Sequence, residues 1–306
     1  MKTIAWIGLG FMGNPMSKHM LSAGYIVKGV DIDLAAREGA AKNGVEICAT
    51  VAEACKGVDA VFTMLPTGAE VKEVLTGPNG VFATIDPNTV VIDCSTIGIE
   101  NARAVHASAK KACRIFAEAP VSGGTEGAID ASLTFMIGCE DPHVARVKEL
   151  LAPMGGYIAH AGGPEAGQAA KVVNNLIMGV CVAVNCEATA LAERLGLNLK
   201  EFFEIATRST ADNWTFRVWN PGVGVVASAP ASKGYKAGFK TWLLAKDLSL
   251  AMDAGREVGA TIATAEAAYA ILKNHIDNGG ADMDATSLVL SLKDAAEKIV
   301  PQKATA

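Results

Sequence analysis

The 306-residue chain has few aromatic and few charged residues, and it has no excess of basic ones. Aromatic residues make up 6% of it, charged residues 19%, and acidic side chains outnumber basic ones by 32 to 27. The net charge of −5 argues against nucleic acid or an anionic membrane as the main partner, because both favour basic surfaces. The sequence therefore predicts no nucleic-acid partner.

Cysteine and histidine are not arranged for disulfides or metals. The seven cysteines include no C-x-x-C pair, and the five histidines are scattered without metal-ligand spacing. An odd number of cysteines in a chain of this length is not typical of a disulfide framework, so we expect a cytoplasmic protein. We expect no metal.

A long apolar run is also missing. The most apolar stretch, residues 172–186, is interrupted by three asparagines, whereas a helix that spans a bilayer needs about 20 predominantly apolar residues. The apolar N-terminus is broken by three glycines and fits a buried strand better than a signal peptide. The sequence predicts a soluble protein without a membrane partner.

What is present is an alternation of β-type and helical segments in the first half. The β-type runs are Thr3–Ile7, Ile26–Val30, Ala60–Met64, Val90–Asp93, Arg114–Glu118 and Thr134–Ile137. This alternation predicts an α/β fold with a doubly wound, mostly parallel sheet. After about residue 164 the pattern becomes helical, apart from a Gly/Pro/Ser-rich loop at 218–239. We predict a Rossmann-like domain over 1–164 and an all-α domain over 165–306, connected by a helix from Ala166 to about Leu195.

A G-x-G-x-x-G pattern follows the first predicted strand directly and opens a helix. It consists of Gly8, Leu9, Gly10, Phe11, Met12 and Gly13. In this context the first glycine permits a tight turn, the second lets the backbone approach a pyrophosphate, and the third lets helix and strand pack closely. These six residues are predicted to bind a dinucleotide at the helix N-terminus.

Asp31 ends the second predicted strand and is followed by Ile32. A carboxylate here accepts hydrogen bonds from the ribose hydroxyls and repels a 2′-phosphate, which favours NAD over NADP. The nearby Arg37 argues in the other direction, because an arginine can bind that phosphate. Asp33 is expected to be a turn or cap residue.

Two further segments carry polar groups suited to a small carboxylate substrate. Ser122, Gly123 and Gly124 follow a predicted strand, where a hydroxyl and unobstructed amides suit an anion. Lys171 and Asn175 are four residues apart and share one face of the long helix. To act as a base near neutral pH, Lys171 needs its pKa lowered by roughly 2–3 units, which apolar surroundings can supply. The alternative is a snorkelling lysine and a buried, hydrogen-bonded asparagine.

Six motifs together resemble the β-hydroxyacid dehydrogenase family over essentially the whole chain. They are GLGFMG at 8–13, MLP at 64–66, DCST at 93–96, PVSGG at 120–124, GQAAKVVNN at 167–175 and GF…AKDLSLA at 238–251. The resemblance implies that Lys171 is the catalytic acid/base and that Asn175 orients the substrate. It implies that Ser122, Gly123 and Gly124 hold the substrate carboxylate. It further implies cofactor contacts from Leu65, Pro66, Thr96 and Lys246, with Asp247 beside the substrate.

The loop at 218–239 is similar to that of the branch of the family that oxidises 3-hydroxyisobutyrate. Trp214 and Phe239 are expected to present apolar walls, Trp214 to the substrate and Phe239 to the cofactor. One departure is Ala131, which stands where the family usually has glycine. The resemblance implies NAD-dependent oxidation of a small 3-hydroxy acid, most simply 3-hydroxyisobutyrate to methylmalonate semialdehyde in valine catabolism.

Two alternatives stay open. One is an NAD(P)H-dependent reductase of tartronate semialdehyde, succinic semialdehyde or a sulfonated aldehyde. The other is a non-catalytic dinucleotide-binding sensor or scaffold, in which the glycines survive but the lysine at 171 is lost. The apolar C-terminal helices, including Thr261–Leu272, are expected to bury the interface of a homodimer or homotetramer.

Overall fold

The computed structural model describes residues 2–299, of which residues 294–299 are described by their backbone alone. The chain divides into two compact units, Met1–Val172 and Val173–Ala306. The division falls within the long helix α9 (Ala166–Arg194), whose observed extent agrees with the helix predicted from Ala166 to about Leu195. The domain boundary predicted between residues 164 and 165 stays a prediction.

The first unit is built on one sheet. In the described residues its strand order is β3-β2-β1-β4-β5-β6-β8-β7, and β9 pairs with β8. The strands are β1 (Thr3–Ile7), β2 (Ile26–Val30), β3 (Glu46–Ile47), β4 (Ala60–Thr63), β5 (Val90–Asp93), β6 (Ile115–Glu118), β7 (Val121–Ser122), β8 (Leu133–Gly138) and β9 (Gly155–Gly162). From β3 to β6 all pairs are parallel, while β8 runs antiparallel to both β6 and β7. The predicted Rossmann-like, mostly parallel sheet is confirmed.

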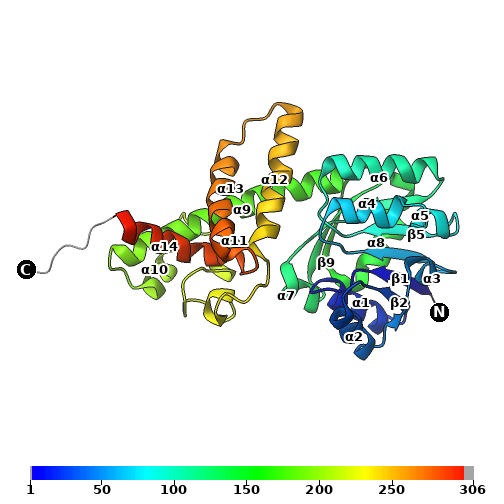
Figure 1. Cartoon of the computed structure of the whole chain (residues 1–306), viewed down its shortest axis with the longest axis horizontal. Helices are drawn as coiled ribbons and strands as arrows, with labels where there is room; N and C mark the ends of the chain where they lie inside the picture. Colours follow the sequence, from blue (N-terminus) through cyan, green and yellow to red (C-terminus); the bar gives the residue numbers. More distant parts are fainter. Residues whose placement is uncertain (1, 300–306) are drawn as a thin grey trace, which may run out of the picture. The chain divides into compact units, whose positions relative to one another are not determined.

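Helices cover both faces of this sheet (Figure 1). They are α1 (Gly13–Ser22), α2 (Leu34–Lys42), α3 (Val51–Ala54), α4 (Gly68–Thr76), α5 (Val81–Thr84), α6 (Ile99–Lys111), α7 (Gly124–Ile129) and α8 (Val144–Leu151). Along β1, Ile4 and Trp6 join one buried cluster, whereas Ala5 and Ile7 join the other. Because both faces are buried, the strand is apolar throughout rather than alternating.

The second unit is all-helical in the residues described, as predicted. After α9 it contains α10 (Leu199–Ala206), α11 (Trp214–Val218), α12 (Thr241–Val258), α13 (Ala263–His275) and α14 (Leu288–Ile299). Figure 1 shows α12 and α13 as neighbouring helices, and they pack together. The apolar side chains of α13, such as Ala268 and Leu272, belong to the core of this same unit. The part of 261–272 expected at a subunit interface therefore also serves the chain's own packing.

The loop at 218–239 is ordered by hydrogen bonds from buried groups. The hydroxyl of Tyr235 donates to the carbonyl of Pro221 at 3.1 Å, and a short 3₁₀ turn spans Pro230–Lys233. The buried carboxylate of Asp284 accepts hydrogen bonds from the backbone N–H groups of Gly238 and Phe239. Burial raises the pKa of Asp284, and these donors oppose that rise.

By length and composition α9 could cross a membrane, since an 18-residue window within it has a mean hydropathy of 1.5. Half of that window is buried inside the protein, and the core helix of a soluble protein meets the same criteria. Lys171, Asn175 and Asn185 are also buried on this helix. The feature is therefore weak evidence for a membrane span.

Candidate active site

The glycine turn between β1 and α1 has three different environments at its three glycines. Gly8 has φ +93°, and a Cβ there would lie 2.2 Å from the carbonyl oxygen of Met64. A Cβ on Gly13 would lie 1.9 Å from the carbonyl oxygen of Gly8, so α1 and β1 pack with no room for a side chain. A Cβ on Gly10 would meet no protein atom within 4 Å. The space beside Gly10 fits a pyrophosphate group that approaches the backbone closely.

The N-terminus of α1 is suited to an anion. Over its described length this helix has no acidic side chain in its first turn, and no side chain caps it at Met12. Beside Met12, Phe11 is 76% exposed, so its ring is not part of the protein core. The positive end of the helix dipole is therefore left to attract a phosphate.

Asp31 follows β2 and is bonded to the glycine turn. Its Oδ2 accepts from the backbone N–H of Leu9 at 2.6 Å, and its Oδ1 accepts from that of Asp33 at 2.8 Å. The carboxylate stays partly exposed, and Ile32 beyond it is 96% exposed. Asp33 caps α2 by accepting from the backbone N–H of Ala35, as predicted for a cap residue. Asp31 is thus fixed beside the glycine turn with its carboxylate partly exposed.

The loops after β4 and β5 lie at the same edge of the sheet as the glycine turn, because β4 pairs in parallel with β1 and β5 pairs in parallel with β4. The backbone N–H of Leu65 donates to Oγ of Ser95 at 2.9 Å, and that hydroxyl donates to Oδ1 of Asp93 at 2.6 Å. Pro66 is exposed and Thr96 is half-buried. The predicted cofactor residues of these two loops are therefore connected through Ser95, which we had not singled out from the sequence.

Asp93 is a buried carboxylate beneath these loops. Its Oδ1 also accepts from Oγ1 of Thr63 at 2.7 Å, while its Oδ2 is buried without a hydrogen-bond partner. Burial raises the pKa of Asp93 to about 6, against the hydrogen bonds from Ser95 and Thr63, and nearby Glu118 raises it further.

Ser122, Gly123 and Gly124 lie where β7 leads into α7. Gly123 has φ +130° and Gly124 has φ +64°, so both occupy backbone conformations that favour glycine. A Cβ on Gly124 would meet no protein atom within 4 Å, so its amide is open to approach. The segment continues from the carboxyl end of β6, which places it at the same sheet edge as the cofactor loops.

Lys171 lies in the second turn of α9 and is 6% exposed. The helix start is bonded to the sheet, because the backbone N–H of Gly167 donates to Oε1 of Glu118 at the end of β6. The other oxygen of Glu118 is bonded to His106 of α6. Burial raises the pKa of Glu118, and His106 opposes that rise. The start of α9 is therefore fixed at the carboxyl end of β6, and Lys171 is buried one helical turn after Gly167.

In the second unit, Asn175 and Asp247 form a buried pair. Nδ2 of Asn175 donates to Oδ2 of Asp247 at 2.6 Å, and Nδ2 of Asn174 donates to Oδ1 of Asn175 at 3.0 Å. Nζ of Lys246 lies 3.2 Å from the other carboxylate oxygen of Asp247. These contacts settle the orientation of the Asn175 amide, with its nitrogen toward Asp247.

The two aromatic residues predicted at the site differ in environment. Trp214 is 50% exposed at the start of α11, where Asn213 caps the helix. Phe239 is half-buried, and its ring centroid lies 6.1 Å from that of Trp219. Trp219 in turn donates from Nε1 to Asp284. Phe239 therefore belongs at least in part to the core of this unit.

The first unit thus brings the glycine turn, Leu65, Thr96, the 122–124 turn and Lys171 to one edge of the sheet. Asn175, Trp214, Phe239, Lys246 and Asp247 belong to the second unit. Sequence reasoning missed four buried polar residues beside this edge of the sheet, Asp93, Ser95, Glu118 and Gln168. A signal for three of them was present in the sequence. Asp93 and Glu118 each end an apolar strand, and Gln168 lies inside an apolar helix.

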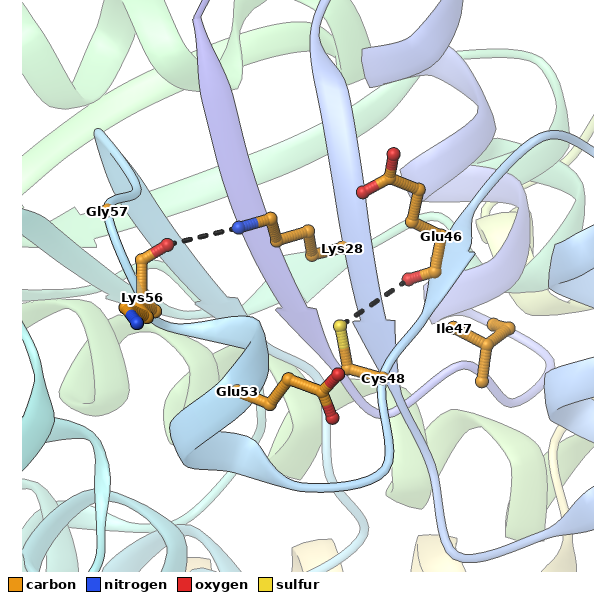
Figure 2. A pocket seen from close by; sticks show the side chains of 7 residues that line it. All are labelled: Lys28, Glu46, Ile47, Cys48, Glu53, Lys56 and Gly57. Atoms are coloured by element: carbon orange, nitrogen blue, oxygen red, sulfur yellow. Dashed lines mark hydrogen bonds between the residues drawn. The ribbon is translucent and has the colours of Figure 1, made fainter.

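A surface cavity of about 810 Å³ lies away from these residues, beside β2 and β3 (Figure 2). Its lining consists of Lys28, Glu46, Ile47, Cys48, Glu53, Lys56 and Gly57. Nζ of Lys28 is bonded to the carbonyl of Lys56 at 3.0 Å, and burial raises the pKa of the Cys48 thiol. The thiol is therefore not activated as a nucleophile. In the described part of the chain no group of three or more His, Cys, Asp and Glu side chains is placed to hold a metal ion.

A doubly wound sheet with an open glycine turn before its first helix defines a dinucleotide-binding protein. Two family profiles match the chain. The NAD binding domain of 6-phosphogluconate dehydrogenase matches residues 3–163, and the NAD-binding domain of NADP-dependent 3-hydroxyisobutyrate dehydrogenase matches residues 165–292.

Individual relatives agree over nearly the full length. A probable 3-hydroxyisobutyrate dehydrogenase of Mycobacterium tuberculosis is 41% identical over 97% of this chain and 100% of its own. An NAD-dependent L-serine dehydrogenase of Pseudomonas aeruginosa is 39% identical over 93% of this chain and 95% of its own. A solved structure of the Mycobacterium tuberculosis 3-hydroxyisobutyrate dehydrogenase with L-serine covers 96% of this chain and 99% of its own, with a TM-score of 0.86 and 41% identity.

The chain belongs to the β-hydroxyacid dehydrogenase family and is similar to its 3-hydroxyisobutyrate dehydrogenases. It is an NAD-dependent 3-hydroxyacid dehydrogenase.

Proposed function

We propose that the enzyme oxidises 3-hydroxyisobutyrate to methylmalonate semialdehyde, a step of valine catabolism. The names of the relatives support this substrate, and the open turn at Gly10 supports the cofactor. NAD, when bound, accepts the hydride from the carbon that carries the substrate hydroxyl. The protein has to hold the substrate and remove the hydroxyl proton.

Lys171 removes that proton. Its burial near the edge of the sheet that carries the glycine turn is the observation on which the proposal rests. A buried amine at this position is shielded from bulk water, so it can exchange a proton with a bound substrate rather than with solvent. As the carbinol carbon loses its hydride, the hydroxyl proton passes to Nζ of Lys171 and the C–O bond becomes a carbonyl. In the reverse direction the same ammonium returns the proton.

Asn175 lies one helical turn beyond Lys171 on α9, so a substrate oxygen within reach of one is close to the other. Its amide oxygen accepts from Asn174, and its nitrogen donates to Asp247. The amide is thereby oriented to offer a second N–H to the reacting oxygen. The negative charge of Asp247 favours this orientation, since charged acceptors form the stronger hydrogen bonds.

The remaining residues hold the two ligands. Ser122 and the amides of Gly123 and Gly124 bind the substrate carboxylate, with Trp214 as an apolar wall. Gly8–Gly13, Leu65, Pro66, Thr96, Lys246 and Phe239 contact the cofactor. Asp31 selects NAD, because its carboxylate sits where a 2′-phosphate would be repelled.

L-Serine is a second candidate substrate. Two of the relatives are named with it, and it differs from 3-hydroxyisobutyrate in having an ammonium group in place of the methyl group. Glu126 supports it, because this exposed carboxylate stands in the first turn of α7, directly after the 122–124 turn. An ammonium group held near that turn would be attracted to it.

The enzyme acts in the cytoplasm as a homodimer or homotetramer, without nucleic acid or membrane. Exposed apolar side chains along α9 support the oligomer, since such a stripe is more often covered than left in water. They are Val173, Ile177, Val184 and Leu191.

The test is a panel in which 3-hydroxyisobutyrate and L-serine are assayed with NAD and with NADP, and the corresponding semialdehydes with NADH and with NADPH. We expect the highest kcat/KM for 3-hydroxyisobutyrate with NAD. Lys171→Ala should lower kcat by at least ~10²-fold while NAD binding is kept. Lys111→Ala, at an exposed lysine of the same unit, is the control. Near-normal turnover by Lys171→Ala would refute the mechanism, and preference for a semialdehyde with NADPH would identify a reductase.

A further inference from the structure

Gln168 is fully buried and uses both ends of its amide on one backbone segment. Its Oε1 accepts from the N–H groups of Ile97 and Gly98, at 3.0 and 3.2 Å. Its Nε2 donates to the carbonyl of Ser95 at 2.8 Å. A single side chain from the start of α9 thus satisfies three backbone groups of the loop between β5 and α6.

That loop is part of the proposed cofactor site. It contains Thr96, and Ser95 in it accepts from the N–H of Leu65 in the neighbouring cofactor loop. The hydroxyl of Ser95 is also bonded to the buried Asp93. A displacement of residues 95–98 would therefore be transmitted to both of these loops, which are proposed to contact the cofactor.

The other end of the connection is Lys171, three residues after Gln168 on the same helix. A second contact fixes the helix start, since Gly167 donates to Glu118 and packs against β8 with no room for a side chain. A Cβ on Gly167 would lie 2.4 Å from the carbonyl oxygen of Met136. With its first turn held in this way, α9 transmits the position of Gln168 to Lys171.

We propose that Gln168 is a positioning residue that sets the distance between the proposed general base Lys171 and the 95–98 loop beside the cofactor. This inference rests on the proposed function of Lys171. The hydride and the proton leave neighbouring atoms of the substrate. The cofactor and Lys171 must therefore both be correctly placed at the same time. Misplacement by about 1 Å can cost 10²-fold in rate.

Three variants test this role. Gln168→Leu keeps the size of the side chain and removes all three hydrogen bonds. Gln168→Glu keeps an acceptor for Ile97 and Gly98 but loses the donor to Ser95. Thr89→Val is the matched control, because it removes a buried hydrogen bond of the same unit, from Thr89 to the carbonyl of Val58, just before β5 begins and away from the site.

The readouts are kcat, KM, the dissociation constant for NAD, the melting temperature, and the isotope effect on kcat with substrate deuterated at the carbinol carbon. We expect Gln168→Leu to lower kcat by about 10-fold or more with NAD affinity within about 3-fold of wild type. The isotope effect should increase, because hydride transfer becomes the slow step. Gln168→Glu should be intermediate, and Thr89→Val should lower the melting temperature without changing kcat.

An unchanged kcat in folded Gln168→Leu would overturn the inference. So would a loss of kcat in Thr89→Val that scales with its loss of stability, since Gln168 would then act through folding alone. If Gln168→Leu does not fold, Gln168→Glu decides, and wild-type kinetics in that variant count against the inference. Failure of the proposed function is recognised separately, by an active Lys171→Ala variant or by wild-type protein that oxidises no 3-hydroxy acid.

Discussion

Asn175 and Asp247, on helices α9 and α12, form a buried hydrogen bond of 2.6 Å from Nδ2 to Oδ2. The bond determines which end of the asparagine amide is the nitrogen. Both partners favour the same orientation, because Asn174 donates to the amide oxygen and Asp247 accepts from the amide nitrogen. The pair is therefore a specific target for mutation.

Asp247→Asn should lower kcat by about 10- to 100-fold, because the Asn175 amide loses the charged acceptor that orients it. The free energy of unfolding should fall by about 1.5–3 kcal/mol, the usual contribution of a hydrogen bond to a charged group. Steady-state kinetics and urea denaturation measure the two effects. Asp253→Asn, at an exposed aspartate of α12 paired with Arg256, should change neither. Wild-type turnover by Asp247→Asn would show that Asp247 has no role in the site.

Gly10→Ala should weaken NAD binding, whereas Gly13→Ala should lower the stability of the fold. The Cβ added at position 10 meets no protein atom within 4 Å, so stability without cofactor should change by less than about 0.5 kcal/mol. NAD binding should weaken by about 10-fold or more, because that Cβ occupies the space of the pyrophosphate. Gly13→Ala should destabilise the protein itself, since its Cβ would lie 1.9 Å from a carbonyl oxygen. Calorimetric titration with NAD and thermal melts without it separate the two, and normal NAD affinity in Gly10→Ala would contradict the proposed phosphate position.

The contribution of Asp93 to the free energy of unfolding should decrease as the pH rises from 4 to 7. Burial raises its pKa in the folded protein to about 6 from the ordinary 3.8, so its stabilising contribution is complete below pH 3.8 and is lost as the pH passes about 6. The difference corresponds to about 3 kcal/mol at most. Asp93→Asn does not titrate, so its stability relative to wild type should improve over this range. Denaturant unfolding at pH 4, 5, 6 and 7 checks this, and exposed Asp86→Asn should track wild type throughout.

Ala131→Gly should stabilise the protein by up to about 1 kcal/mol. Ala131 has φ +52°, a backbone conformation that is strained for a residue with a side chain. Removal of the Cβ relieves this strain and is opposed in part by the greater freedom of glycine in the unfolded chain. Ala107→Gly, at an exposed position within α6, should destabilise by about 1 kcal/mol instead. Equal losses in both variants would show that Ala131 carries no strain.

The observed bounds of β1, β2 and β5 agree with the predicted ones to the residue. β1 and β5 are buried on both faces and read as short apolar runs, whereas β2 contains Lys28 and is only partly buried, and its β-branched residues and flanking turn residues were the signal. β3 and β7 are too short to show a pattern, and β9 has few buried side chains, so these strands were missed. The tight turn expected at Gly8 and the close packing expected at Gly13 agree with the space around these glycines, and the role of Gly10 stays a prediction.

The hydrogen bonds of the site could not be predicted in the same way. Gln168 lies inside a quoted motif, yet its partners are about 70 residues earlier in the chain. Asn175 and Asp247 are 72 residues apart. Periodicity reports which face of a helix is buried, but it carries no information on which buried polar groups meet.

The three glycines have different surroundings. They would therefore be substituted at different rates in the sequences of descendants that no longer bind the cofactor. Gly8 and Gly13 are required by the backbone around them, so selection for folding alone would retain both. Gly10 has no such constraint from the protein. A descendant that no longer used a dinucleotide could keep two of the three glycines indefinitely, and a side chain at position 10 would be the earliest sign of the change.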